Sequence, residues 1–411
     1  MNDILDTATL PPLKLKKGKE APFIRNHPWL FSGALEDPAS DARPGLRSLE
    51  IQGKISAWVM YNPAVSLCAR LLPRTAHLDL SQADTLRYYL DDRLRSAIEL
   101  RRRLFTDYFR QQEARGPITS GFRLINAEGD GLPGIILDYY DGLIVAQVST
   151  AVAEMLWPLI RKSLLDLSAE FPAPLRILER SDGAFRRAEN LPARRQWFTE
   201  EIQEAWFLEN GIKMLCDLEG QKTGFFLDMR NMRELLGQVA LDADVLNLYS
   251  YTGAFGLHCL KGGARRVVQV DRSSRALELA RSMADANELV SEYHSVDVDE
   301  YLKNESQQFD IVISDPPAFA KKKGDVKSAA RAYRELNRRA LERTVPGGML
   351  LTCSCSHFIT EDHFASLVME AATLAGRQSQ ILSHHRPALC HPVALPHREG
   401  SYLKSLLLRV Y

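Results

Sequence analysis

One stretch of the sequence, residues 245–271, constrains the fold more than any other. It opens with an apolar run, passes through a loop that contains Gly253 and Gly256, and closes with a second apolar run that ends on Asp271. This order predicts a strand, a loop, a helix and a second strand. Glycine lets a backbone approach a ligand closely, and a carboxylate at the second strand end accepts from ribose hydroxyls. The stretch predicts a nucleoside site, although doubly wound sheets without one show the same turn.

The glycine spacing narrows the choice of ligand. Gly253 and Gly256 stand without the third glycine of the dinucleotide fingerprint. A ligand that lacks a pyrophosphate therefore fits better. S-adenosylmethionine, an adenosine joined to an amino acid, is such a ligand.

Two later stretches have the same form. Residues 310–320 are a buried strand pattern that ends in Asp315-Pro316-Pro317, and residues 349–356 are another that ends in Ser-Cys-Ser around Cys355. In an open α/β sheet, ligands lie beyond the carboxyl ends of the strands. We therefore expect all three motifs to meet in one crevice.

The chain closely resembles the class I methyltransferases and, within them, the ribosomal RNA large subunit methyltransferase I family, a family of PUA-domain enzymes that methylate cytosine C5 in 23S rRNA. The resemblance covers nearly the whole chain. Besides the three motifs above, it rests on residues 25–34, 129–134, 222–228 and 391–393.

The expected fold class is α/β, with three parts. Residues 11–82 alternate short apolar runs with turns, which suits a small β-barrel; the resemblance makes it a PUA domain. Residues 83–198 predict a helical connector and a middle α/β domain. Residues 199–411 predict the Rossmann-like methyltransferase domain with a mostly parallel seven-stranded sheet.

Composition excludes several classes of protein. The net charge is zero, so local patches rather than bulk charge would have to hold RNA. No apolar run reaches the ~18 residues of a membrane span, and the predicted compartment is the cytoplasm. The six cysteines are too scattered for a disulfide framework. A zinc site from His384, His385, Cys390 and His391 matches no usual spacing, so no metal is predicted.

The first part also carries basic residues. Residues 1–10 are expected to be a loose tail. The pattern of Lys14, Lys16 and Lys17 agrees equally well with contacts to RNA phosphates and with a solvated strand edge that lysines protect from pairing. The resemblance to a PUA domain favours the contacts to RNA. The run 101–103, three arginines in a predicted helix, is interpreted as a solvated face.

The expected cofactor residues fall into two sets. The resemblance implies that residues in 221–228 line the S-adenosylmethionine pocket, although the sequence alone also suits a helix entry loop; these are Gln221, Thr223, Gly224, Phe226 and Asp228. The strand ends supply Tyr251, Thr252, Gly253 and Ala254 toward the amino-acid part, Asp271 toward the ribose and Asp315. Asp297 either meets the adenine amine or caps a helix, with Asp299 as its rival.

Cys355, at the end of the predicted strand 349–356, suggests covalent chemistry. Cytosine C5 is a poor nucleophile until a thiolate adds to C6. We assign Cys355 as that nucleophile, because it stands at a strand end in the Ser-Cys-Ser of the family, whereas Cys353 suits a small buried hydrophobe. Asp315, stiffened by Pro316, is the expected partner of the base. Phe319 is expected either to stack on the flipped base or to pack in the core. Lys321 is expected either to contact a phosphate of the RNA or to lie in solvent.

One departure and two alternatives remain open. Many RNA cytosine-C5 enzymes carry a second cysteine after the Asp315 strand; here prolines stand there, so the resemblance assigns no base for the C5 proton. Methylation of a guanine or an exocyclic amine of rRNA needs no cysteine. A non-catalytic RNA-binding assembly factor is the other alternative. The expected partner is 23S rRNA or a precursor of the large ribosomal subunit, and the sequence leaves a homodimer open.

Overall fold

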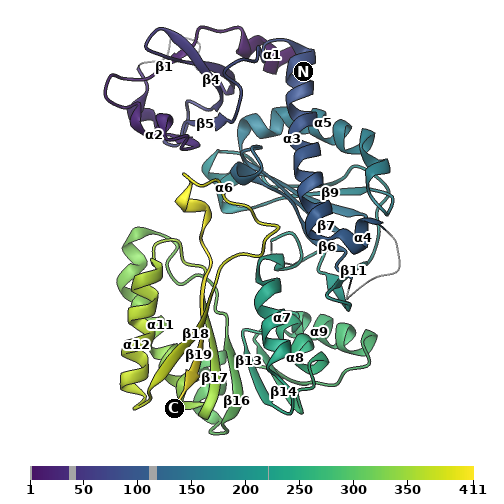
Figure 1. The fold of residues 1–411 in the computed structure, drawn as a ribbon, viewed down its shortest axis with the longest axis vertical. Coiled ribbons are helices and arrows are strands. Elements are labelled where there is room, and N and C mark those ends of the chain that lie inside the picture. The colour runs from purple at the N-terminus through teal and green to yellow at the C-terminus, as the bar shows by residue number, and fades with distance from the viewer. Residues whose placement is uncertain (1, 37–42, 111–117, 221) are drawn as a thin grey trace. The chain divides into compact units, whose positions relative to one another are not determined.

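The computed structural model describes residues 2–36, 43–110, 118–220 and 222–411 (Figure 1). The chain divides into two compact units. The first comprises Met1–Phe207, Cys216–Phe225 and Leu389–Gly400. The second comprises Leu208–Leu215, Phe226–Ala388 and Ser401–Tyr411. Two short segments of the C-terminal half thus belong to the first unit, whereas the sequence predicted one continuous methyltransferase domain over residues 199–411.

The N-terminal part of the first unit is built on a five-stranded sheet. Its order is β1 (Leu13–Lys14), β3 (Gly45–Ile51), β4 (Lys54–Tyr61), β5 (Ala69–Leu72), β2 (Trp29–Leu30). Helix α2 (Ala21–Ile24) lies between β1 and β2 in the chain. The expectation of a loose tail was wrong, because residues Asn2–Ala8 form helix α1, which buries Ile4 and packs against β3.

The rest of the first unit is a second five-stranded sheet with helices. The sheet order is β10 (Arg194–Trp197), β9 (Arg176–Ser181), β8 (Leu143–Val148), β7 (Ile135–Tyr140), β6 (Gly121–Asn126). The helices are α3 (Ala83–Leu104), α4 (Thr106–Arg110), α5 (Ala151–Asp166) and α6 (Ala184–Ala188). A hairpin at Asp141-Gly142 joins β7 and β8, and both turn residues have positive φ, as such a turn requires.

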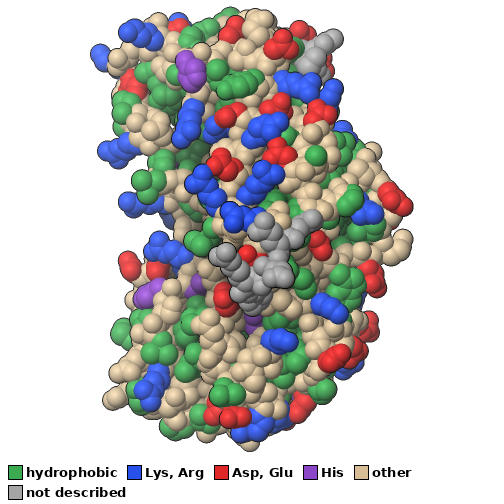
Figure 2. All heavy atoms as spheres, turned by 45° about the vertical axis from the view of Figure 1, so that its right-hand side comes forward, with side chains coloured by type: hydrophobic (Ala, Val, Ile, Leu, Met, Phe, Trp, Pro, Cys, Tyr) green, Lys and Arg blue, Asp and Glu red, His purple; other side chains and the backbone are tan. Residues whose placement is uncertain are grey.

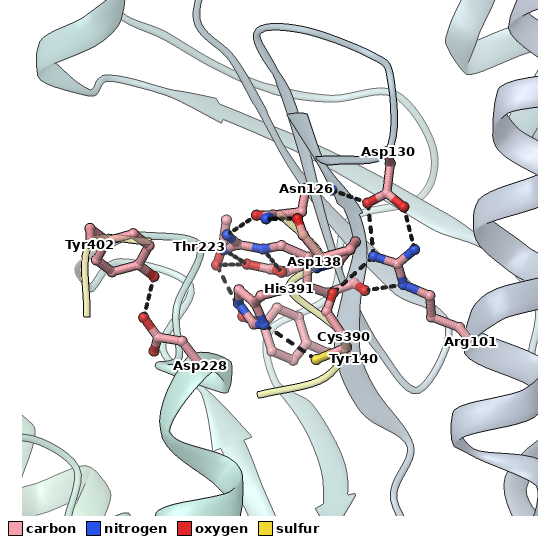
Figure 3. A network of polar contacts seen from close by, with 12 residues as sticks. Arg101, Asn126, Asp130, Asp138, Tyr140, Thr223, Asp228, Cys390, His391 and Tyr402 are labelled. Carbon is pink, nitrogen blue, oxygen red and sulfur yellow. Dashed lines mark hydrogen bonds and ion pairs between the residues drawn. The ribbon is translucent and has the colours of Figure 1, made fainter. Parts of the chain in front are cut away.

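The run of arginines in α3 is not uniformly solvated. Arg101 is fully buried and makes a bidentate ion pair with Asp130, at 2.6 and 2.9 Å. It also donates to the carbonyl oxygens of Arg123 and Cys390 at 2.8 Å (Figure 3). Arg102 and Arg103 are exposed. The solvated-face interpretation was therefore wrong for Arg101, whose fork of donors serves the packing of the unit.

A two-stranded hairpin of β11 (Ala205–Glu209) and β12 (Ile212–Cys216) precedes the large sheet. The seven-stranded sheet runs β15 (Glu292–Ser295), β14 (Arg266–Asp271), β13 (Asp244–Leu248), β16 (Phe309–Ser314), β17 (Thr344–Ser354), β19 (Lys404–Val410), β18 (Ser379–His385). The first five are parallel, and β19 is antiparallel to both of its neighbours. The mostly parallel seven-stranded sheet is confirmed.

Helices cover both faces of this sheet, as Figure 1 shows. They are α7 (Arg230–Gln238), α8 (Ala254–Lys261), α9 (Ser274–Ala286), α10 (Val298–Asn304), α11 (Val326–Glu342) and α12 (Glu361–Leu374). Alternate residues of the inner strands pack into the two hydrophobic cores on opposite faces of the sheet. Leu350 packs with α10, α11 and α12, whereas Leu351 and Cys353 pack with α7 and α8. Burial on both faces explains the continuous apolar runs of the sequence.

Among the described residues, no helix combines the length and the apolar character that crossing a bilayer requires.

Candidate active site

Four neighbouring strands bring the sequence motifs to one edge of the seven-stranded sheet. Asp271 ends β14, the loop of residues 249–253 follows β13, Asp315 follows β16 and Cys355 follows β17. These four strands are adjacent and parallel, so their carboxyl ends share an edge. The structure therefore brings the three motifs together, as the sequence predicted.

Asp271 holds the loop after β13. Its Oδ2 accepts from the backbone N–H of Tyr251 at 2.9 Å, and its Oδ1 accepts from that of Ser273 at 2.9 Å. Tyr251 has φ +48°, a conformation that a tyrosine adopts only when other contacts enforce it. The Phe226 ring meets the Tyr251 ring edge-on, with centroids 5.4 Å apart. The carboxylate thus fixes the backbone of the loop and keeps further lone pairs for other donors.

Gly253, which precedes α8, and Gly256, within it, have a packing reason besides the close approach to a ligand that was expected. A Cβ on Gly253 would lie 2.7 Å, and one on Gly256 2.4 Å, from Nε2 of Gln269. Gln269 is buried in β14, donates to the Gly253 carbonyl at 3.2 Å and accepts from Asn247 at 2.8 Å. The glycines make room for this glutamine, which the sequence reasoning missed because nothing in the pattern marks Gln269.

Three carboxylates, those of Asp271, Asp297 and Asp299, lie near Tyr249 at the end of β13. Asp271 ends β14, and Asp297 and Asp299 follow β15. Burial raises the pKa of Tyr249, and the charges of Asp299, Asp297 and Asp271 raise it further. Asp297 also accepts from the Asp299 backbone N–H at 2.9 Å and so caps α10, the simpler of its two expected roles. This edge of the sheet is accordingly negative.

S-adenosylmethionine fits this edge by its chemistry. Its sulfonium and ammonium are cationic, and its ribose offers hydroxyl donors, which carboxylates accept well. In the same loop, Ser250 Oγ is buried and has no hydrogen-bond partner among the described residues. A buried hydroxyl of this kind is normally satisfied, so a bound ligand would complete it.

Cys355 is the accessible thiol of the chain. It is half-buried, while the other five cysteines are buried. Strand β17 ends at Ser354, so Cys355 lies past the packed layer, with its Sγ 3.9 Å from the Pro316 carbonyl oxygen. Cys353 is inside the α7–α8 core, and burial holds its pKa well above the usual value. The two cysteines thus differ as the sequence suggested.

The residues after Asp315 have distinct surroundings. Phe319 packs against the core, with its ring centroid 4.7 Å from that of Tyr333. Lys321 is exposed, and its backbone N–H donates to Asp325 at 3.1 Å. Phe319 therefore has at least a packing role.

The cofactor residues expected in 221–228 are divided between the units. Gln221 lies outside the described residues. The Thr223 side chain is buried in the first unit and donates to Asp138, and its hydroxyl lies 3.1 Å from that of Tyr140 (Figure 3). Gly224 has φ +113°, and a Cβ there would lie 2.4 Å from Cys216 Sγ. These contacts give Thr223 and Gly224 structural roles.

Asp228 belongs to the second unit and binds two other residues of that unit, Ala388 and Tyr402. Its backbone oxygen accepts from the N–H of Ala388 at 2.8 Å, and its Oδ2 accepts from the Tyr402 hydroxyl (Figure 3). Ala388 and Tyr402 flank the Leu389–Gly400 segment in the chain. Asp228 is itself buried. Its partners are far away in sequence, so no local pattern could reveal this role.

The basic residues of the first sheet are exposed. Lys14 lies in the edge strand β1 and pairs with Glu50 at 3.6 Å, and Lys16 and Lys17 follow it. Figure 2 shows Lys and Arg side chains interspersed with Asp and Glu on the face drawn, in keeping with the net charge of zero. Within the described ranges, no group of three His, Cys, Asp or Glu side chains is arranged to hold a metal.

Comparisons with known proteins agree with this geometry. The family model described as S-adenosylmethionine-dependent methyltransferase matches residues 182–408, and that of a PUA-like domain matches residues 13–74. Ribosomal RNA large subunit methyltransferase I of Aeromonas salmonicida is 36% identical over 409 residues, covering 96% of this chain and 98% of the relative. That of Salmonella arizonae is 35% identical over 413 residues, covering 97% and 98%.

A solved structure shares the fold. The crystal structure of SMU.776, described as a methyltransferase and complexed with SAH, superimposes with a TM-score of 0.80 at 22% identity, over 97% of this chain and 100% of that one. With the matches in sequence, the chain therefore belongs to the S-adenosylmethionine-dependent methyltransferases, within the family of the ribosomal RNA large subunit methyltransferase I proteins.

Proposed function

We propose that this S-adenosylmethionine-dependent enzyme methylates C5 of a cytosine in large-subunit ribosomal RNA through a covalent bond between Cys355 and C6. The placement of Cys355 carries the proposal: a half-buried thiol, past the end of β17, against the Pro316 carbonyl. The names of the relatives support ribosomal RNA of the large subunit as the substrate. The PUA-like domain and the exposed Lys14, Lys16 and Lys17 support RNA contacts in the first unit.

Each residue has a defined task in this reaction. The Cys355 thiolate bonds to C6, and the electron pair of the C5–C6 double bond becomes available at C5. S-adenosylmethionine, when bound, would supply an electrophilic methyl group; C5 bonds to that methyl group, and S-adenosylhomocysteine is the leaving group. The Asp315 carboxyl accepts from the exocyclic amine and shares a proton with N3, which holds the ring in place, and Pro316 stiffens its turn. A base then takes the C5 proton, and the electron pair of that C–H bond re-forms the C5–C6 double bond and expels the Cys355 thiolate from C6, which releases 5-methylcytosine.

The alternative reactions differ in what they require. Methylation of a guanine or an exocyclic amine uses a nitrogen lone pair and needs no thiol. An accessible cysteine against the Pro316 carbonyl, one residue after Asp315, favours the carbon reaction over that one. A non-catalytic assembly factor would need neither the negative edge at Asp271 nor Cys355.

An RNA that contains 5-fluorocytosine should trap the enzyme. Fluorine at C5 cannot leave as a proton does, so the bond between Cys355 and C6 should persist after methyl transfer. We expect a protein–RNA complex that survives denaturing electrophoresis and depends on S-adenosylmethionine. Cys353→Ala should form it and Cys355→Ala should not. Nucleoside mass spectrometry of unmodified RNA provides the second readout, and a methyl group on guanine or on an exocyclic amine would refute the proposal.

Asp271 is proposed to bind the ribose of the cofactor. Asp271→Ala removes a charged acceptor and the anchor of the Tyr251 amide. Loss of ~1.5–3 kcal/mol corresponds to binding about 10–100-fold weaker. Titration calorimetry with S-adenosylhomocysteine measures it. Glu278→Ala, an exposed acid in the neighbouring α9, is the matched control. Equal affinity in both variants would remove Asp271 from the site.

A further inference from the structure

A buried lysine lies behind the proposed nucleophile. Lys404 is the first residue of β19, and its side chain is buried. Its Nζ donates to the carbonyl oxygens of Ser356 at 2.7 Å and Ile359 at 2.8 Å. Both carbonyls belong to the chain that follows β17. A buried ammonium group needs such partners, because leaving it unpaired is costly.

Strand pairing between β17 and β19 places this lysine opposite Ser354, the residue that precedes the thiol in the chain. Burial lowers the pKa of Lys404, and the charges of Cys355 and Glu361 oppose that effect. The ammonium of Lys404 and a thiolate at Cys355 therefore lie within electrostatic reach of each other.

The serines on either side of the thiol are held in place by other contacts. Ser354 and Ser356 are fully buried, and the Tyr333 hydroxyl lies 3.0 and 2.9 Å from their Oγ atoms. Ser356 Oγ also accepts from the Ala320 N–H at 3.1 Å. Because both neighbouring residues are held by hydrogen bonds, the backbone at Cys355 has a defined position.

The other titratable groups near Cys355 do not favour a negative sulfur. Burial raises the pKa of Tyr333 on α11, which keeps that ring neutral. Cys353, on the same strand, is buried, and it feels the charges of Asp315 and Cys355. Asp315, on the loop after β16, and Glu361, at the start of α12, carry negative charge. Among these groups Lys404 is the cation.

We propose that Lys404 is a positioning residue that holds the turn around Cys355 and favours its thiolate form. The proposal deepens the proposed function, because a thiolate is the species that adds to C6. An opposite charge at ~4–6 Å favours an ionised group by about 1–3 pH units. The effect of Lys404 on Cys355 should therefore be measurable without any turnover.

The test is the pH profile of Cys355 alkylation by iodoacetamide in the full chain, followed by mass spectrometry of the Cys355 peptide. Lys404→Gln removes the charge but keeps an amide donor for the carbonyls. In this variant, the pH midpoint of Cys355 alkylation should rise by about one pH unit or more, so that alkylation near neutral pH becomes roughly tenfold slower. Lys404→Arg keeps a positive charge, so its midpoint should lie between those of wild type and Lys404→Gln. Lys327→Met, an exposed lysine of α11, is the control and should match wild type.

An unchanged midpoint in a folded Lys404→Gln would overturn the proposal. If Lys404→Gln does not fold, Lys404→Met, which keeps the apolar stem and removes the charge, is the second variant. The midpoint of Cys355 alkylation should rise in it as well, and an unchanged midpoint rejects the role of Lys404. This readout is separate from catalysis: an active Cys355→Ala would refute the covalent mechanism while leaving the alkylation result untouched.

Discussion

Cys355→Ala is expected to lower the methylation rate by about 10³-fold or more, equivalent to ~4 kcal/mol of barrier. The thiol supplies the bond that activates C5, and no other described cysteine is accessible to replace it. Affinity for S-adenosylhomocysteine should stay unchanged, because Cys355 is not among the residues proposed to bind the cofactor. Transfer of a radiolabelled methyl group to RNA measures the rate, and calorimetry measures the affinity.

Cys353→Ala is the matched control for this result. It removes a thiol two residues earlier on the same strand, from a position packed inside the α7–α8 core. It should cost some stability, of the order of 1 kcal/mol, and leave turnover largely intact. Full activity in Cys355→Ala, or equal losses in the two variants, would contradict the assignment of Cys355.

The largest effect on stability is expected at Glu209, which the sequence did not single out. Its carboxylate is fully buried in the second unit and accepts from Arg233 at 2.6 and 2.8 Å, from Arg230 at 3.3 Å and from His258 at 3.2 Å. Glu209→Ala leaves two buried arginines without their shared anion. The expected loss is about 3–5 kcal/mol, whereas Glu234→Ala, exposed on α7, should change stability by less than ~0.5 kcal/mol.

The measurement must follow the second unit. All five tryptophans lie in the Met1–Phe207 part of the first unit, so their fluorescence is a poor probe of Glu209. Hydrogen exchange of peptides from β13 and α8 during urea unfolding reports the right unit. Equal protection in Glu209→Ala and Glu234→Ala would show that the cluster contributes little.

The same cluster gives stability a definite pH dependence. Burial by itself would raise the pKa of Glu209, but Arg233, His258 and Arg230 outweigh burial and hold the pKa well below its usual range. The folded state therefore binds this proton less readily than the unfolded state. The contribution of Glu209 is complete above the unfolded value of about 4.3 and declines as the pH falls toward the folded value. The gap between wild type and Glu209→Gln should narrow in acid.

The sequence predicted that the three motifs share one edge of the sheet, because the signals of these motifs are local. Asp271, Asp315 and Cys355 each follow an apolar run, and parallel strands bring their ends together whatever the remaining packing does. The structural roles of three other residues were missed: Arg101 was interpreted as part of a solvated face, Thr223 was expected to line the cofactor pocket, and Lys404 was not singled out. Their partners lie far away in the chain, as with Lys404 and Ser356 or Arg101 and Cys390. Pattern analysis has no means of finding such pairs, since they depend on the tertiary fold.

The segment Leu389–Gly400 has a consequence for biosynthesis. It belongs to the first unit, and β19, which joins β17 to β18, comes directly after it in the chain. Domains usually fold in order as they leave the ribosome. Here the first unit lacks one of its segments until residues 389–400 have been translated, and the second lacks an inner strand until residues 404–410 follow. A chain that terminates prematurely just before residue 389 should thus yield two incomplete bodies, both candidates for chaperones and proteases.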